Sequence, residues 1–160
     1  MATVLLVTDR HSVRNVLRPA LKDAGYEVTT CVGPQPSSYL CLGSRCGWCP
    51  LAKRADVVVF DSDVAGDRVG GGTTANDLIR LYGRMDRPLV VLADAVCSTQ
   101  WKGDRDVEVL GSAAGPQAVL DATARAIAGH RRVQSAASEP EELAGPKRWI
   151  EGTTVSVAEL

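Results

Sequence analysis

Four of the five cysteines in this 160-residue chain lie in one short stretch, at Cys31, Cys41, Cys46 and Cys49. Their spacing is C-x9-C-x4-C-x2-C. A group of thiols this dense predicts a metal ion, an iron–sulfur cluster or disulfides. A chain of this length that is 45% hydrophobic buries enough surface to fold without disulfides or structural metal ions. We therefore expect the cysteines to have a role beyond stability.

Two kinds of bound group fit four thiolates. The C-x4-C-x2-C part resembles the spacing in plant-type ferredoxins, where a fourth cysteine completes a 2Fe–2S site, and a 4Fe–4S cluster needs the same number of ligands. Zn²⁺ in a tetrahedral site is the alternative, but structural zinc sites more often use two C-x2-C pairs, and only Cys46 and Cys49 form one. The x4 gap and the following Pro50 favour an iron–sulfur cluster.

Other interpretations of the cysteines stay open. Cys31 is also explained as a small buried residue at the end of a strand. Cys46 and Cys49 have the C-x-x-C spacing of a redox-active dithiol of the thioredoxin type. Cys97 follows a different predicted strand and is expected to be a lone thiol, with replacement of Cys31 as a ligand the alternative.

The elements that must position these residues alternate between strands and helices. Apolar runs predict five strands, at residues 3–7, 26–31, 56–60, 88–93 and 107–110. Helical patterns begin near Ser12, Thr74 and Pro116, while Pro19 is expected to kink or break the first helix. We predict an α/β fold, a doubly wound, flavodoxin-like parallel sheet with strand order 2-1-3-4-5. The cysteine loop replaces the expected second helix because prolines and glycines there exclude a long one.

Two strand ends carry a resemblance to a known family. The first strand ends in Val-Thr-Asp9 and the third in Val-Phe-Asp61. In this pattern the chain resembles response-regulator receiver domains, the CheY-like fold. The resemblance implies that Asp9 and Asp61 hold Mg²⁺ and that Asp61 accepts a phosphoryl group. Thr8 stands where the family has a second acidic residue, Ala93 where it has a hydroxyl, and 111–112 where it has Lys-Pro.

The missing hydroxyl at Ala93 and the missing lysine at 111–112 remove two contacts that neutralise charge during phosphoryl transfer. We therefore expect Asp61 not to accept a phosphoryl group readily from small donors.

Composition narrows the possible partners. A net charge of −1 gives no electrostatic reason to bind nucleic acid or a membrane, and the longest apolar runs are too short to span a bilayer. The first residues read as a strand and not as a signal peptide, so we expect a cytoplasmic protein. His11 and His130 are predicted at the surface, and the glycines at 70–72 in a flexible loop.

These patterns together predict a receiver-like regulatory protein. Residues 1–130 form the domain, with the cysteine loop at 31–53, and residues 131–160 form a linker and a tail that docks on a protein partner. The metal or iron–sulfur group is predicted to act as a sensor. The alternatives are iron–sulfur electron transfer and a phospho-accepting receiver with structural zinc. The sequence shows no nucleophile–base arrangement of the kind that would indicate an enzyme.

Overall fold

One parallel sheet organises the molecule. The computed structural model describes residues 1–34, 41–65, 74–94, 101 and 106–138. Five strands pair in the order β2-β1-β3-β4-β5, as predicted. They are β1 (Thr3–Val7), β2 (Glu27–Cys31), β3 (Val57–Asp61), β4 (Leu89–Ala93) and β5 (Val107–Gly111).

Burial of the central strands explains their sequences. Every residue of β3 and β4 is buried, and so is all of β1 after Thr3. A parallel strand covered on both faces needs apolar side chains in both directions, which the continuous Val and Leu runs supply. The register pairs Val7 with Phe60 and Asp61 with Leu92, so the strands end together.

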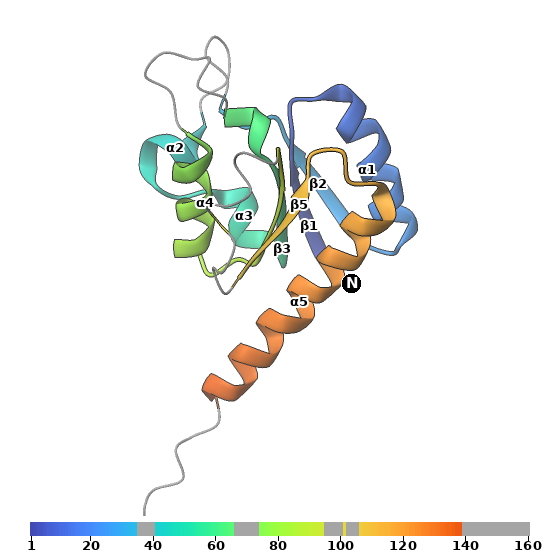
Figure 1. Ribbon diagram of the computed structural model, residues 1–160. Coiled ribbons are helices and arrows are strands. Elements are labelled where there is room, and N and C mark those ends of the chain that lie inside the picture. Colours follow the sequence, from blue (N-terminus) through green and yellow to red (C-terminus); the bar gives the residue numbers. More distant parts are fainter. Residues whose placement is uncertain (35–40, 66–73, 95–100, 102–105, 139–160) are drawn as a thin grey trace, which may run out of the picture.

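Helices cover both faces of the sheet (Figure 1). One face carries α1 (His11–Asp23) and α5 (Pro116–Ser138); the other carries α2 (Leu42–Cys46), α3 (Pro50–Arg54) and α4 (Ala75–Arg84). A short 3-10 helix, η1 (Ser62–Ala65), follows β3. Alternate strand residues feed the two cores: Leu6 packs with Leu17 and Leu21 of α1, and residues such as Phe60 pack with α4.

Helix ends match the sequence signals in part. Thr74 and Asp77 form a capping box at the start of α4, where the sequence predicted that a helix begins. Gly25, just past α1, has a φ of +87°, as a helix-terminating glycine should. Pro19 lies inside α1 without breaking it, and α1 begins at His11, with Arg10 in the N-cap position and no side-chain capping hydrogen bond.

Over the described residues 41–54, the cysteine segment forms two five-residue helices and no long one, as its prolines and glycines predicted. Gly47 separates α2 from α3 with a φ of +67°, a conformation that glycine adopts without steric cost. Cys49 caps α3, and its sulfur accepts a hydrogen bond from the Ala52 amide at 3.5 Å. Pro50 takes the first helical position, where no amide hydrogen is needed.

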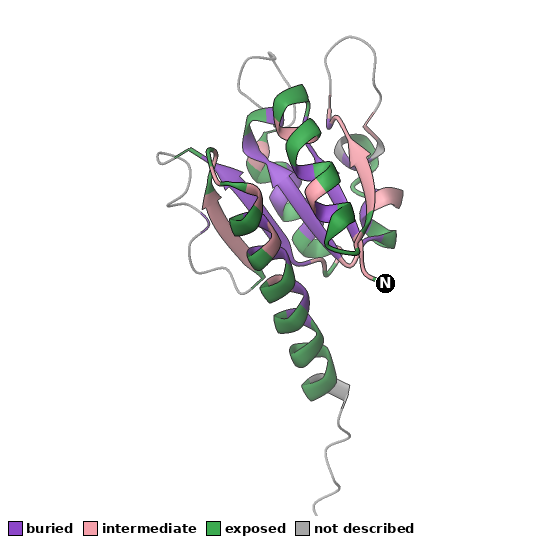
Figure 2. Ribbon diagram, turned by 90° about the vertical axis from the view of Figure 1, so that its right-hand side faces the viewer, coloured by how far each residue is buried: buried purple, intermediate pink, exposed green. Residues whose placement is uncertain are grey.

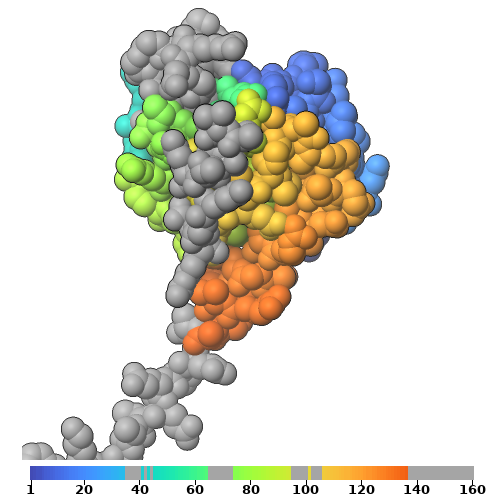
Figure 3. All heavy atoms as spheres, viewed as in Figure 1, coloured from blue at the N-terminus to red at the C-terminus, as the bar shows by residue number. Residues whose placement is uncertain are grey.

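Helix α5 is longer than predicted. It continues through Ser138, eight residues past His130, where the composition had suggested that a linker begins. Alanine, arginine and glutamine in this stretch favour helix, and no proline interrupts it before Pro140. Residues 131–136 are exposed, and this end of the helix projects from the body of the domain (Figures 2 and 3). Among the described helices, none has the length and apolar character needed to cross a bilayer.

His130 is buried, so the prediction of a surface position is wrong. Its ring lies between two carboxylates, with Asp86 at 3.7 Å and Asp106 at 3.8 Å, and its Nε2 lies 2.8 Å from the Gln134 amide nitrogen. The turn after α4 and the start of β5 close over this position. Sequence spacing alone did not reveal that tertiary arrangement. Residues 70–72 and Cys97 lie outside the described residues.

Candidate functional site

Asp61 is the polar end of a fully buried strand, and its own exposure is 0%. Since β1 and β3 run in register up to Val7 and Phe60, Thr8, the residue after β1, lies beside Asp61. Thr8 is buried as well. The sheet thus places a carboxylate where little water can solvate it, and its charge must be met by protein groups.

Arg10 meets that charge. Its Nε donates to Asp61 Oδ2 at 2.7 Å, and a terminal nitrogen donates to Oδ1 at 2.8 Å. This is the forked geometry in which a guanidinium binds both oxygens of a carboxylate. The Thr8 hydroxyl also donates to Oδ2, at 2.8 Å, and the Asp63 amide to Oδ1, at 3.4 Å. Each oxygen of Asp61 therefore accepts two hydrogen bonds.

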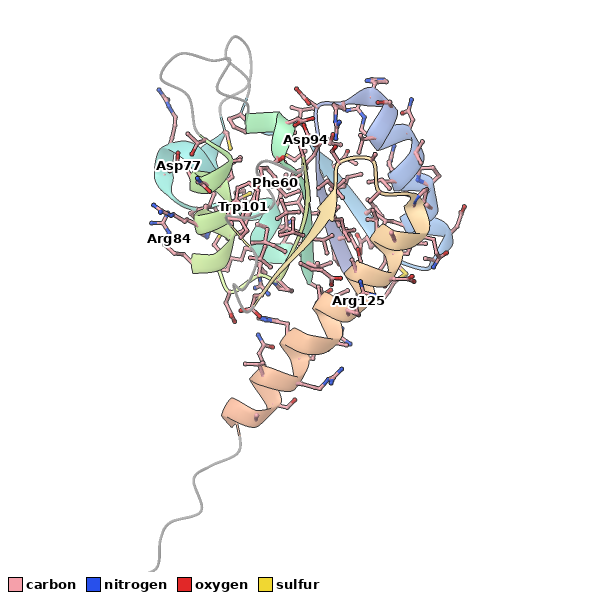
Figure 4. All side chains as sticks on the ribbon, viewed as in Figure 1. Phe60, Asp77, Arg84, Asp94, Trp101 and Arg125 are labelled. Atoms are coloured by element: carbon pink, nitrogen blue, oxygen red, sulfur yellow. The ribbon has the colours of Figure 1, made fainter. Side chains whose placement is uncertain are left out.

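More acidic residues surround the pair. Arg10 also contacts Asp63 at 3.1 Å, and Asp9 and Asp94 lie at the same end of the sheet. Figure 4 shows Asp94 at that end, above Phe60 in the interior. The hydroxyl of Ser112, which follows β5, donates to Asp94. Unlike Asp61, the residues Asp9, Asp63 and Asp94 are exposed to solvent.

The pKa values follow from this arrangement. Partial burial lowers the pKa of Arg10, but the hydrogen bonds and charge of Asp61 outweigh it and raise the pKa above its ordinary value. Burial raises the pKa of Asp63; Arg10 opposes this rise, and the charges of the neighbouring carboxylates add to it. Arg10 therefore stays charged at every physiological pH, and Asp63 binds its proton more readily than an isolated aspartate.

The residues do not fit Mg²⁺ at Asp61. Mg²⁺ demands near-octahedral oxygen ligands at about 2.0–2.1 Å. The guanidinium lies against both oxygens of Asp61, and no three His, Cys, Asp or Glu side chains among the described residues are grouped to hold a metal ion. The predicted pairing of Asp9 and Asp61 around Mg²⁺ therefore does not match the contacts that Asp61 makes.

The cysteines are spread over two helices and a strand end. Cys49 is buried, Cys46 is exposed, and Cys31 and Cys41 are half-buried. The Cys31 sulfur accepts a hydrogen bond from the Gly33 amide at 3.4 Å. The described residues do not bring the four thiols into one metal-binding group, so the four-cysteine site stays a prediction.

Two of these cysteines nevertheless lie near the same glycine. A Cβ atom placed on Gly43 would lie 3.6 Å from the Cys41 sulfur and 3.5 Å from Cys49 Cβ. The same atom would lie 2.7 Å from Leu81 Cδ2 of α4. Glycine at position 43 thus lets α2 approach α4 closely.

Solved structures with a similar fold are receiver domains. A response regulator receiver domain protein from Clostridium thermocellum has a TM-score of 0.62 at 17% identity, over 83% of this chain and 99% of its own. The chain has the receiver fold. A receiver protein from Sinorhizobium medicae WSM419 has a TM-score of 0.57 at 20% identity, over 81% of this chain and 96% of its own.

A third similar structure contains the chemistry that the resemblance implied. It is a response regulator from Burkholderia pseudomallei with a phosphorylated aspartic acid and a calcium ion, with a TM-score of 0.54 at 18% identity, over 86% of this chain and 74% of its own. No protein-family model and no curated protein matches the chain. The likeness establishes the receiver fold, and the site must be judged on its own residues.

Sequence reasoning missed Arg10, and it treated Thr8 only as a departure from the family. Both residues turn out to hold Asp61. The sequence did carry a signal for Arg10. It directly follows Thr8-Asp9 at the end of the first predicted strand, and the neighbouring third strand ends in Asp61, a carboxylate expected to be buried. The need of a buried carboxylate for a partner charge predicts such a residue, but spacing does not say which one.

Proposed function

We propose that this protein is a receiver-like regulatory protein that signals to a protein partner without phosphorylation of Asp61. The observation that supports this is the occupation of both Asp61 oxygens by Arg10 and Thr8. A carboxylate oxygen must approach a phosphorus atom in line to accept a phosphoryl group. Here that oxygen must first lose charge-assisted hydrogen bonds to a residue on the neighbouring loop.

Two further features point the same way. Ala93, which ends β4, is buried and has no hydroxyl, and the residue after β5 that faces this end is Ser112, with no lysine. Developing charge on a transferred phosphoryl group would therefore have few fixed donors to stabilise it. The site is built to hold Asp61 in one arrangement, which suits a domain whose surface is read by a partner.

Labelling with a small phosphodonor tests the proposal. Purified protein is incubated with acetyl phosphate and Mg²⁺, and the intact mass is compared with that of Asp61→Asn treated alike. We expect no Asp61-dependent mass increase. Robust, Mg²⁺-dependent labelling that vanishes in Asp61→Asn contradicts the proposal and favours the second candidate, a phospho-accepting receiver, for which the position of Asp61 at the end of β3 is the supporting observation.

Metal or iron–sulfur sensing through Cys31, Cys41, Cys46 and Cys49 is a separate proposal about the same protein. Its support is the spacing in the sequence and the approach of Cys41 and Cys49 around Gly43. Anaerobically purified protein is analysed for metal content and visible absorption, together with single Cys→Ser variants. If all four variants keep the metal content of the parent, the shared site is wrong.

A further inference from the structure

The Arg10–Asp61 pair combines a fully buried anion with a half-buried cation. The Asp61 side chain is 0% exposed and that of Arg10 is 31% exposed. An ionised carboxylate in such a place is stable only if a fixed positive charge lies against it. An ionised Asp61 therefore needs one cation against it, whatever the chemical nature of that cation.

Geometry leaves room for only one such cation. Direct coordination of a metal ion needs an oxygen lone pair of Asp61, and both oxygens already accept two hydrogen bonds each. Two positive charges at this spacing would also repel each other in a medium of low dielectric constant. A divalent ion and the Arg10 guanidinium therefore exclude each other at Asp61.

The arginine has an advantage that a dissolved ion lacks. Arg10 belongs to the turn between β1 and α1 and occupies the N-cap position of α1, so its backbone is fixed by the start of the helix. Its backbone amide donates to the Thr8 hydroxyl at 3.2 Å, which in turn donates to Asp61. The cation is thus delivered by the chain itself, and its local concentration does not depend on the solution.

We infer that Arg10 is the resident cation of this site and takes the place that a divalent ion would otherwise fill. This inference rests on the proposed function, because it explains how Asp61 is kept in the single arrangement that the proposed function requires. Asp61 then keeps its arrangement at any Mg²⁺ concentration. Removal of the guanidinium frees both oxygens of Asp61 for Mg²⁺, which proteins usually hold through one or two carboxylates with waters as the other ligands.

The first test uses the unaltered protein. Mn²⁺ is titrated into isotope-labelled protein, and line broadening of the backbone amides is followed in a heteronuclear spectrum. We expect no selective broadening at residues 8–10 and 61–63. Selective broadening there that Mg²⁺ competes away and that is lost in Asp61→Asn overturns the inference. The measurement is independent of phosphodonors, so it can fail while the proposed signalling function stands.

The second test asks whether a metal ion can replace the guanidinium. Arg10→Gln is unfolded thermally with and without Mg²⁺, at matched ionic strength. We expect its melting temperature to rise by about 4 °C at a Mg²⁺ concentration roughly ten times the Kd, and that of the parent to stay constant. The rise should disappear in the double variant Arg10→Gln, Asp61→Asn. If Arg10→Gln folds and Mg²⁺ does not stabilise it, the inference is wrong.

Arg125 offers a matched control. It forms an ion pair with Glu108, but its side chain is 61% exposed, so no buried carboxylate depends on it. Mg²⁺ should leave the melting temperature of Arg125→Gln unchanged, and a rise equal to that of Arg10→Gln would contradict the inference. If Arg10→Gln does not fold in either buffer, Arg10→Lys is used instead, because lysine keeps the charge but cannot bind both oxygens as a fork. The positive charge should still exclude Mg²⁺ from Asp61, so a Mg²⁺-dependent rise in the melting temperature of Arg10→Lys that disappears in Arg10→Lys, Asp61→Asn contradicts the inference.

Discussion

The Asp61 site and the cysteine segment at residues 41–54 both follow strands of the same sheet, yet they are held in different ways. Asp61 is fixed by four hydrogen bonds within 3.4 Å, which come from three residues on two loops. The cysteine segment is held by two short helices, whose small residues Ala52 and Gly43 pack closely against the core. One region depends on charge, and the other depends on backbone shape.

The two regions also differ in how easily they are recognised in the sequence. The four cysteines dominate the sequence, but the described residues do not gather them into one site. The most tightly bonded polar group in the described structure involves Arg10, which belongs to no motif. A buried charge constrains its surroundings more strongly than a pattern of reactive residues does.

Gly33, which follows β2, packs against η1 beside the Asp61 site, and we expect its substitution to have the largest effect. It has a φ of +75°, and a Cβ there would lie 2.1 Å from Val64 Cγ1 in η1, next to Asp61. Gly33→Ala should cost about 2–4 kcal/mol, from backbone strain and overpacking together. Chemical denaturation measures the change.

Gly25→Ala is the control for this prediction. Gly25 has a φ of +87°, but nothing lies within 4 Å of the added atom, so only the backbone strain of about 1 kcal/mol remains. Val64→Ala should recover part of the loss in Gly33→Ala and none of the loss in Gly25→Ala. Equal costs for the two glycines would show that the close approach of Gly33 to Val64 has no energetic effect.

The next largest effect is expected when one substitution in the Asp61 site is compared with one in the cysteine segment. Asp61→Asn keeps the shape of the side chain but loses the charge that Arg10 binds, and it should cost about 1–3 kcal/mol. Cys46→Ser changes an exposed side chain, and in metal-free buffer it should change the free energy of unfolding by less than about 0.5 kcal/mol. Urea unfolding of both variants gives the comparison. A larger cost for Cys46→Ser would reverse the ranking of the two regions.

The smallest expected effect concerns pH. The pKa of Asp63 is raised above its ordinary value of 3.8 in the folded protein. The folded state therefore holds this proton at a pH where the unfolded chain has lost it, and the stability from Asp63 falls as the pH rises through that interval. Asp63→Asn removes this dependence, so its stability relative to the parent should rise between about pH 3 and pH 6. Unfolding curves across this range measure it, and a relative fall would give the pKa shift the opposite sign.

The sequence predicted the sheet well for a physical reason. The strands β1, β3 and β4 are buried on both faces, so their runs of Val and Leu are unmistakable and the acidic residues after them mark the strand ends. The position of Asp61 followed from this pattern.

Side-chain partners were harder to predict. The pairing of Arg10 with Asp61, the burial of His130 between Asp86 and Asp106, and the packing of Trp101 against Asn76 all join residues that are distant in sequence. Periodicity carries no information on such contacts, since they depend on how the loops and helix ends meet. The arrangement of the thiols around Gly43 depends on a turn at Gly47 whose direction the sequence did not specify.

The length of α5 has a mechanical consequence. The helix is anchored to the domain through Ile127, His130 and Gln134, whose side-chain amide donates to Asp86 at 3.2 Å. Residues 135–138 continue it by roughly 6 Å, since each residue adds about 1.5 Å of rigid length. A tilt of about 10° at Gln134 displaces the far end by roughly 1 Å. The direction of this last turn therefore depends on the turn after α4 that holds Asp86.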